Sequence, residues 1–412
     1  MWHLDALGEV TAEKGAAHVS ELCFRDADGY SVYHDVLMRI AILGAGPAGL
    51  YLSFLIKRRV PNVDVTVIEQ NPADATFGFG VVFSDRALEF LRDDDEETYA
   101  AIVPAMESWR DMTLKHPAAR IVIDGIGFAA IERLKLLQLL QARAASVNVT
   151  AIYGCAVKSL DELAEFDVIV GADGVNSLVR RTYANELGAT VGHLTNRFAW
   201  FGTGQVFETL TQTFVDTEWG PFNAHHYRYA PDRSTFIVET GADAFAHAGL
   251  AGKDPAQSQV FCEKVFAATL DGEPLIANNS IWRQFPLVHN VRWSHGKYVL
   301  MGDALHTAHF SIGSGTRLAL EDAIALDKAL AAHPKDVPAA FAAYEAVRRP
   351  VLEKLVGGAN DSANWYENFG EYMKLAPADF AMSYITRSGR VDIERLRKLS
   401  PQFVAWWEKA KT

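Results

Sequence analysis

The chain has 412 residues, of which 49% are hydrophobic and 22% are charged, and its formal net charge is −12 at pH 7. These values predict a folded protein with a large core in two interleaved lobes, and the negative charge argues against nucleic acid as the main partner. No uninterrupted apolar run is long enough to span a membrane. The cysteines (Cys23, Cys155 and Cys262) lie far apart and form no CxxC pair, so we expect no disulfide framework, no metal site and a cytoplasmic location.

Residues 1–37 differ from the rest of the chain. They are polar, show no clear periodicity, and lack the basic start and apolar stretch of a signal peptide. We predict that this segment is a disordered extension, or that the start codon is assigned too far upstream.

A nucleotide-binding unit is predicted at the start of the remaining chain. "RIAILGAGPAGLYLSFLIKRR" (39–59) predicts a strand, a glycine turn and a helix, and "DVTVIEQ" (64–70) predicts a second buried strand. Together they form a βαβ unit that carries the G-x-G-x-x-G fingerprint. Gly44 permits the tight turn, Gly46 lets the backbone approach a pyrophosphate, and Gly49 lets the helix pack closely on the strand.

Glu69 ends the second strand and extends this fingerprint. Its carboxylate is placed to accept hydrogen bonds from an adenosine ribose, and it disfavours a 2′-phosphate, so FAD or NAD fits better than NADP. Ala48, inside the fingerprint, is grouped with the glycines as a cofactor contact. The alternative is a purely structural glycine turn with a surface glutamate.

The middle of the chain changes in character. "AAIERLKLLQLLQARAA" (129–145) predicts a helix, and "FDVIVGADG" (166–174) predicts another buried strand that ends in a turn. Between about 190 and 290, runs such as "STFIVETG" favour antiparallel strands of a separate sheet. "KYVLMGD" (297–303) returns to the α/β pattern, and helices are predicted from there to the end.

Two later turns also carry residues suited to a cofactor. Asp173 ends the strand in "VIVGADGVNSLVR", although alone a strand that ends in Asp-Gly is a common turn. In "MGDALHTAHFSIGSGT" (301–316), Asp303 caps a turn where the ribityl and pyrophosphate parts of a flavin would pass. A glycine loop then opens a helix whose N-terminus would favour negative charge on a reduced flavin. The contacts expected there are Gly313, Gly315 and Thr316.

In this order and spacing, the three motifs resemble those of the single-component FAD-dependent aromatic hydroxylases, and the resemblance covers residues 38 to about 350. "TFGFGVVFSD" (76–85), "HTAHFSIGSGTRLALEDA" (306–323) and "TRSGR" (386–390) resemble the salicylyl-CoA 5-hydroxylase branch and the flavin domain of aminobenzoyl-CoA monooxygenase/reductases. The H-F-S-I-G run also resembles a more distant hydroxylase of tryptophan-derived substrates.

The resemblance implies an α/β fold with a Rossmann-like FAD-binding lobe, an interleaved β-rich substrate lobe and C-terminal helices. We therefore expect an FAD-binding domain at 38–185 and 290–350, a substrate domain at 186–289, and a helical segment at 351–412. Cofactor contacts implied by the resemblance are Gly80, next to Gly78 in the glycine-rich "FGFG" run, and Arg133. The alternatives are a packed core segment and a solvated helix face.

The resemblance also implies the reaction. NADH or NADPH reduces FAD, O2 reacts with the reduced flavin, and one oxygen atom is transferred to an electron-rich aromatic ring. An aromatic acyl-CoA is the expected substrate, with salicylyl-CoA oxidised to gentisyl-CoA in aromatic degradation by a monomer or homodimer. The alternatives are a hydroxylase of a free or carrier-bound aromatic, such as an indole intermediate, and a non-catalytic flavin-binding protein.

Three histidines are candidates for proton handling near neutral pH: His306, His309 and His226. For each, a hydrogen-bonded structural histidine is the alternative. Arg86, Arg348 and Arg349 are candidate partners for the phosphates of CoA.

Overall fold

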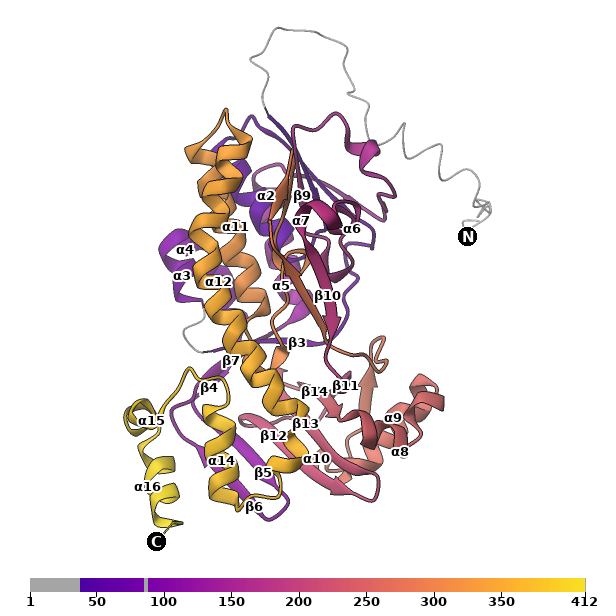
Figure 1. The fold of residues 1–412 in the computed structure, drawn as a ribbon, viewed down its shortest axis with the longest axis vertical. Coiled ribbons are helices and arrows are strands. Elements are labelled where there is room, and N and C mark those ends of the chain that lie inside the picture. The colour runs from indigo at the N-terminus through magenta and orange to yellow at the C-terminus, as the bar shows by residue number, and fades with distance from the viewer. Residues whose placement is uncertain (1–37, 85–87, 412) are drawn as a thin grey trace, which may run out of the picture.

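The computed structural model describes residues 38–84 and 88–411, arranged as two lobes stacked along the long axis of the molecule (Figure 1). The predicted N-terminal extension, residues 1–37, lies outside the described residues. Within the described part, no helix combines the length and the apolar character needed to cross a membrane.

The upper lobe is built on a six-stranded sheet of short, mostly buried strands. In spatial order they are β17 (Ser294–His295), β18 (Tyr298–Leu300), β9 (Val168–Gly171), β1 (Arg39–Leu43), β2 (Asp64–Glu69) and β8 (Thr150–Tyr153). All neighbours are parallel except β17 and β18. Parallel strands covered on both faces require continuous apolar runs, which the sequence supplies in β1 and β9. Because β18 joins this sheet only after the chain has passed through the lower lobe, the upper lobe is discontinuous in sequence.

Helices surround this sheet. The long ones are α2 (Pro47–Arg59), α5 (Arg133–Ser146), α11 (Gly315–Ala332) and α12 (Val337–Glu367), and the short ones are α3 (Glu89–Asp94), α4 (Glu96–Ile102), α6 (Leu178–Thr182) and α7 (Ala184–Leu187). The sequence predicts a helix from residue 129, but α5 begins only at Arg133. Residues 128–132 instead form a strand, because they pair with two partners from other parts of the chain. Tertiary pairing there outweighs the local preference for helix.

The lower lobe is built on a seven-stranded sheet. In spatial order its strands are β15 (Leu275–Ala277), β11 (Arg197–Thr203), β14 (Arg233–Thr240), β13 (Gly220–Ala230), β12 (Leu210–Thr217), β5 (Met112–His116) and β6 (Ala119–Ile123). Neighbours are antiparallel except β12 and β5. The last two strands come from residues that the sequence-based boundaries place in the FAD-binding domain. They belong here because β5 pairs with β12, a long-range contact that no local pattern signals.

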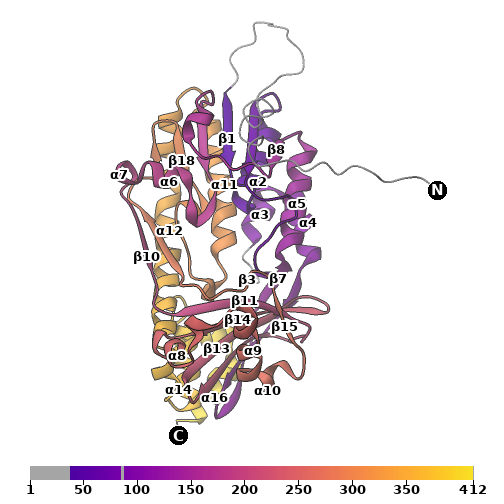
Figure 2. The same cartoon turned by 90° about the vertical axis from the view of Figure 1, so that its right-hand side faces the viewer.

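Both faces of this sheet are covered by helices (Figure 2). The short helices α8 (Ala242–His247), α9 (Pro255–Val265) and α10 (Ala267–Leu270) share a core with β11, β13 and β14. A second core joins the C-terminal end of α12 and the helices that follow it to β5, β6 and β12: α13 (Phe369–Tyr372), α14 (Pro377–Thr386), α15 (Ile393–Leu399) and α16 (Pro401–Lys409). The helix α12 runs along both lobes (Figure 1).

Two small sheets lie where the lobes meet. One consists of β3 (Gly80–Ser84), β7 (Phe128–Glu132) and β4 (Glu107–Trp109), and the other of β10 (Ala189–His193) and β16 (Pro286–Asn290). The first sheet leads directly into α5, because β7 ends at Glu132 and the helix begins at Arg133. The backbone N–H of Arg133 also donates to the carbonyl of Phe79, the residue before β3. The sheet therefore positions the first residue of that helix between the lobes.

Candidate active site

The first glycine turn forms an uncapped helix N-terminus. Gly44 has φ +99°, and a Cβ there would lie 2.4 Å from the carbonyl oxygen of Ala172, so only glycine fits. A Cβ at Gly49 would lie 2.0 Å from the carbonyl oxygen of Gly44, which shows how closely α2 approaches the turn. Gly46 precedes α2, no side chain caps the helix, and a Cβ there would meet no atom within 4 Å. Free backbone N–H groups beside open space suit a phosphate.

Glu69 lies beside this turn at the end of β2. Its Oε2 accepts from the backbone N–H of Ala45 at 2.9 Å, and its Oε1 accepts from the backbone N–H of Asn71 at 2.8 Å. Oε1 also accepts from Asn71 Nδ2 at 2.7 Å, so Oε2 is the oxygen that can accept a further hydrogen bond and remains compatible with a ribose contact.

The second motif packs directly on the first. A Cβ at Gly44 would lie 2.9 Å from the Cα of Asp173, which follows β9. Asp173 Oδ2 accepts from the backbone N–H of Leu178 at 2.6 Å, whereas Oδ1 is buried and has no partner among the described residues. Burial raises the pKa of Asp173. An unsatisfied carboxylate oxygen at this position fits a polar group of a bound cofactor.

The third motif meets the other two at the carboxyl ends of β1, β9 and β18. Arg180 donates from Nη1 to the carbonyl of Ala304 at 2.7 Å and so ties the second motif to the third. Ala48 is buried in the first turn of α2, and a Cβ at Gly302 would lie 3.3 Å from its Cβ. Three motifs that are distant in sequence thus converge on the strand ends where open α/β sheets bind ligands.

Asp303 and Arg133 bring opposite charges to this site. The Asp303 side chain is solvent-accessible, yet its deep position among protein atoms raises its pKa, which His306 and Arg133 partly offset. Burial lowers the pKa of Arg133, which is the first residue of α5, and its buried Nε has no partner among the described residues. Such an orphaned cationic group fits a polar or anionic cofactor edge.

The loop after Asp303 forms a second uncapped helix N-terminus. Gly313 has φ +59° and approaches β3, since a Cβ there would lie 3.1 Å from the carbonyl oxygen of Val82. Helix α11 begins at Gly315 without a side-chain cap, a Cβ at Gly315 would meet no atom within 4 Å, and Thr316 follows in its first turn. The loop can therefore accept a ligand against its backbone.

Packing explains the glycine in the "FGFG" run. A Cβ at Gly80 would lie 2.5 Å from the Cβ of Tyr229, and the Gly80 backbone bonds to Thr235 Oγ1 and Tyr227 Oη. A Cβ at Gly78 would lie 3.2 Å from the ring of Trp200. The neighbours that approach the backbone at these two glycines are thus side chains of the lower sheet.

His306 supports the fold of the third motif. Its Nε2 bonds to Asp322 Oδ2 at 2.7 Å, and the same carboxylate accepts from the backbone N–H of Gly302 and from Arg348 Nε. Although burial opposes the shift, His306 and Arg348 lower the pKa of Asp322. Arg348 is therefore buried and neutralised, not available to a CoA phosphate, and Arg349 pairs with Glu345 and Glu353. Arg86, the third candidate for a CoA phosphate, lies outside the described residues.

The structure places His226 on the opposite face of β13 from the third motif. Its ring packs on Phe207 and Phe236, and its Nε2 bonds to Thr213 Oγ1 at 2.8 Å. Successive residues of a strand point to opposite faces. It is His225, which the sequence analysis did not select, whose ring lies 5.2 Å from that of Phe310 in the loop.

His309 belongs to a buried polar cluster, here called the His309 cluster, formed by residues of both lobes. Its members are His225, Glu239, His309, Ser311, Ser362 and Arg387. His309 Nδ1 accepts from the backbone N–H of Ser311 and lies 2.8 Å from its Oγ. Ser311 Oγ lies 2.7 Å from Ser362 Oγ, which accepts from Arg387 Nε at 2.9 Å.

Three ionisable groups in the His309 cluster have shifted pKa values, and burial lowers that of His225. Burial lowers the pKa of His309 to about 4, so its imidazole is neutral at pH 7, and the Ser311 N–H then places the ring proton on Nε2. Burial raises the pKa of Glu239, whose Oε2 lies 3.3 Å from His225 Nε2. His225 Nδ1 lies 2.9 Å from Gln212 Nε2. Only the alternation of β13 could have pointed to His225 in the sequence.

Comparisons with known proteins agree with this architecture. Residues 145–359 match the family described as FAD binding domain. Salicyloyl-CoA 5-hydroxylase of a Streptomyces species is 42% identical over 361 residues, which cover 85% of this chain and 70% of that protein. The 3-hydroxy-4-methyl-anthranilyl-(aryl-carrier protein) 5-monooxygenase of Streptosporangium sibiricum is 35% identical over 329 residues, 80% of this chain and 89% of that protein. The crystal structure of PqsL, a probable FAD-dependent monooxygenase of Pseudomonas aeruginosa, superposes with a TM-score of 0.64 at 20% identity, over 85% and 100% of the two chains.

Proposed function

Because the chain belongs to the FAD-dependent monooxygenases that carry this FAD binding domain, we propose that it hydroxylates salicylyl-CoA at the position para to the phenol, which gives gentisyl-CoA. NADH or NADPH is the proposed electron donor. The observation that supports this choice of substrate is the extent of similarity to the Streptomyces salicyloyl-CoA 5-hydroxylase. Reduced FAD supplies the electrons that activate O2 in such enzymes.

The residues that would hold FAD follow from the three converging turns. The uncapped start of α2 at Gly44, Gly46, Ala48 and Gly49 suits the pyrophosphate, and Glu69 suits the adenosine ribose. The polar remainder of the cofactor would contact Arg133 and Asp173, whose buried Nε and Oδ1 have no partner among the described residues, and Asp303, whose pKa is raised by its deep position. The uncapped start of α11 at Gly313, Gly315 and Thr316 would meet the flavin edge, and Gly80 is the first residue of β3, the strand that Gly313 approaches.

His309 would act on the substrate as a hydrogen-bond donor. A ring whose Nδ1 already accepts from Ser311 presents an N–H at Nε2, which has no partner among the described residues. Donation to the phenol oxygen stabilises the phenolate, and a phenolate is richer in electrons at its para carbon. The rings of Phe310 and Phe285, 4.2 and 4.9 Å from this imidazole, would keep water from it.

A substrate panel tests the proposal. The FAD-loaded enzyme is incubated with NADH, O2 and each of salicylyl-CoA, free salicylate, salicylate on an aryl-carrier protein and a tryptophan-derived acid. We expect strong stimulation of NADH oxidation, and a product one oxygen atom heavier, with salicylyl-CoA alone.

The second candidate is hydroxylation of a carrier-bound aromatic, which the similarity to the Streptosporangium enzyme favours. Turnover of the carrier-bound salicylate without turnover of the CoA ester would select it. If no aromatic compound stimulates the oxidation of either NADH or NADPH, both proposals fail and a non-catalytic flavin protein remains.

A further inference from the structure

Three arginines near the start of α11 form a cluster with excess positive charge. The arginine cluster consists of Arg317 on α11, Arg390 in the "TRSGR" turn, and Arg395 on α15. Arg395 Nη1 donates to the carbonyl of Arg390 at 3.4 Å. The Arg390 side chain lies against α12, since a Cβ at Gly358 would be 3.1 Å from its Cδ.

Carboxylates do not neutralise this cluster. Within residues 38–84 and 88–411, no ion pair involves Arg390 or Arg395. Arg317 Nε pairs with Glu321 Oε1 at 2.7 Å, so the unpaired charges of the cluster are those of Arg390 and Arg395. Burial, and then Arg317 and Arg395, lower the pKa of Arg390. Three like charges with one carboxylate partner among them favour the binding of an anion.

The arginine cluster lies close in the chain to the candidate active site. Arg317 follows Gly315, where α11 begins, by two residues. Arg390 follows Arg387 by three residues, and Arg387 Nη2 donates to the carbonyl of Ser311 in the loop that holds His309. A flexible thioester arm could therefore extend from the loop to the cluster.

A cavity of about 640 Å³ borders the same region. Its lining includes the aromatic side chains of Tyr99, Trp109 and Phe128, and the exposed Arg110. Two contacts connect it to the cluster. The lining residue Glu89 adjoins Phe90, whose ring lies 5.8 Å from Arg317 Cζ, and the lining residue Gly125 packs on the carbonyl of Leu399 in α15, the helix of Arg395.

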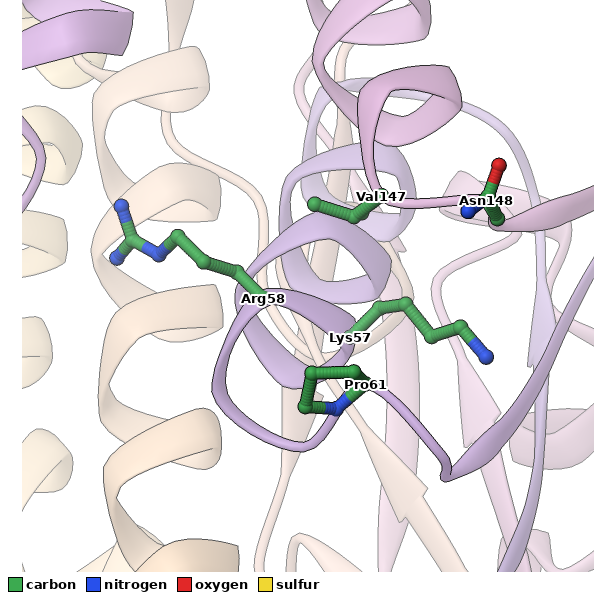
Figure 3. A pocket seen from close by; sticks show the side chains of 5 residues that line it. All are labelled: Lys57, Arg58, Pro61, Val147 and Asn148. Carbon is green, nitrogen blue, oxygen red and sulfur yellow. The ribbon is translucent and has the colours of Figure 1, made fainter.

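Another cavity lacks these features. About 390 Å³ is enclosed by Lys57, Arg58, Pro61, Val147 and Asn148, at the C-terminal end of α2 and thus at the far end of that helix from Gly46 (Figure 3). The side chains of Lys57 and Arg58 extend away from each other, and Arg58 pairs with Asp95. Only the larger cavity combines aromatic lining, a nearby unneutralised cluster and proximity to the active-site loop.

We propose that the arginine cluster and the 640 Å³ cavity together bind the phosphorylated adenosine end of a CoA thioester. The arginines would bind the phosphates, and the aromatic lining would receive the adenine. This inference rests on the proposed function, because it gives a binding site to the CoA end of the same substrate whose aromatic ring is proposed to lie at His309. The cavity favours CoA over a carrier protein, since the carrier-bound arm has a phosphate but no adenosine.

The test compares two thioester substrates, and compares cluster variants with a control variant, in the FAD-loaded enzyme. The variants are Arg390→Ala and Arg395→Ala, and the matched control is Arg397→Ala, which lies on α15 but pairs with Glu394 and Glu408. Binding of 3′,5′-ADP is measured by calorimetry, and kcat/KM is measured for salicylyl-CoA and for salicylyl-pantetheine, which lacks the nucleotide. Thermal unfolding checks that each variant is folded.

We expect each cluster variant to weaken 3′,5′-ADP binding about tenfold and to lower the preference for the CoA ester over the pantetheine ester by a similar factor. Arg397→Ala should match the unsubstituted enzyme in both measurements. Should Arg390→Ala fail to fold, Arg390→Lys, which keeps the cation, and Arg395→Ala carry the test: binding retained in the first and weakened in the second supports the site.

The outcomes separate the inference from the proposed function. If both thioesters are hydroxylated with equal kcat/KM and the cluster variants change neither value, the site is refuted and the proposed function stands. If 3′,5′-ADP binds in an arginine-dependent manner but neither thioester is hydroxylated, the nucleotide site is supported and the proposed function fails. If 3′,5′-ADP does not bind the unsubstituted enzyme, the assignment to CoA is overturned.

Discussion

The glycine turns at the carboxyl ends of β1, β9 and β18 and the His309 cluster present their functional groups in different ways. The turns use backbone groups. Gly44 makes the turn with a positive φ, and the open space at Gly46 leaves the N–H groups at the start of α2 accessible. The His309 cluster uses side chains, which reach one another from β13, β14, α12 and the segment after α14. A backbone site tolerates few changes at its glycines, whereas a side-chain site depends on contacts between distant segments.

The largest effect is expected at Asp322, which anchors the third turn. Asp322→Ala would leave the buried Arg348 and His306 without their shared carboxylate and should lower the free energy of unfolding by about 3 kcal/mol. Urea denaturation measures this. The control is Asp327→Ala on the same helix, whose partner Arg59 is about half exposed and whose loss should cost about 1 kcal/mol or less. Equal losses would contradict the role given to Asp322.

A pair of glycine substitutions tests how the first turn works. Gly44→Ala should destabilise the protein by about 2–3 kcal/mol, because its φ is positive and its Cβ would collide with Ala172. Gly46→Ala should change stability by less than about 1 kcal/mol, because its Cβ meets nothing, but should reduce FAD retention. Denaturation and the flavin-to-protein absorbance ratio report the two effects. Full flavin occupancy in Gly46→Ala would show that backbone approach is not needed there.

His309→Gln should distinguish substrate activation from cofactor binding. We expect kcat for salicylyl-CoA to fall about tenfold with FAD content unchanged, because the imidazole donates to the substrate and does not hold FAD. The pKa of His309 is lowered to about 4, so its protonation should give kcat no slope between about pH 6 and 8. His226→Gln is the control, since β13 separates that ring from the loop. A comparable loss of kcat in the control would contradict the assignment of faces.

The last effect concerns acid stability. Burial lowers the pKa of His225, His226 and His309 in the folded protein, so the unfolded chain takes up their protons first as the pH falls below about 6.5. The folded state therefore loses stability between about pH 6.5 and 4, by at most about 1.4 kcal/mol per pH unit for each histidine. His226→Gln should reduce the slope by about 1 kcal/mol per pH unit in denaturation series. An unchanged slope would mean that folding does not lower the pKa of His226.

Much of the upper lobe could be predicted because its signals are local. The strand, glycine turn and helix of residues 39–59 follow each other directly, and the comparisons confirm the FAD-binding family and the α/β fold class. The strand at 128–132 and the inclusion of β5 in the lower sheet could not be predicted. Both depend on pairing with distant partners, to which a local pattern of hydrophobicity is insensitive.

The sequence by itself determined where the backbone must turn, because a glycine such as Gly44 is required by sterics that act within a few residues and across one strand. It also determined which residue types stand near those turns, including the two adjacent histidines of β13. Only the tertiary structure decided that His225 faces the active-site loop while His226 faces the opposite core. It also decided that Arg348 forms an ion pair with Asp322 and that Arg390 has no carboxylate partner among the described residues. These outcomes depend on which surfaces pack together, and a side chain's partners are fixed only when distant segments of the chain meet.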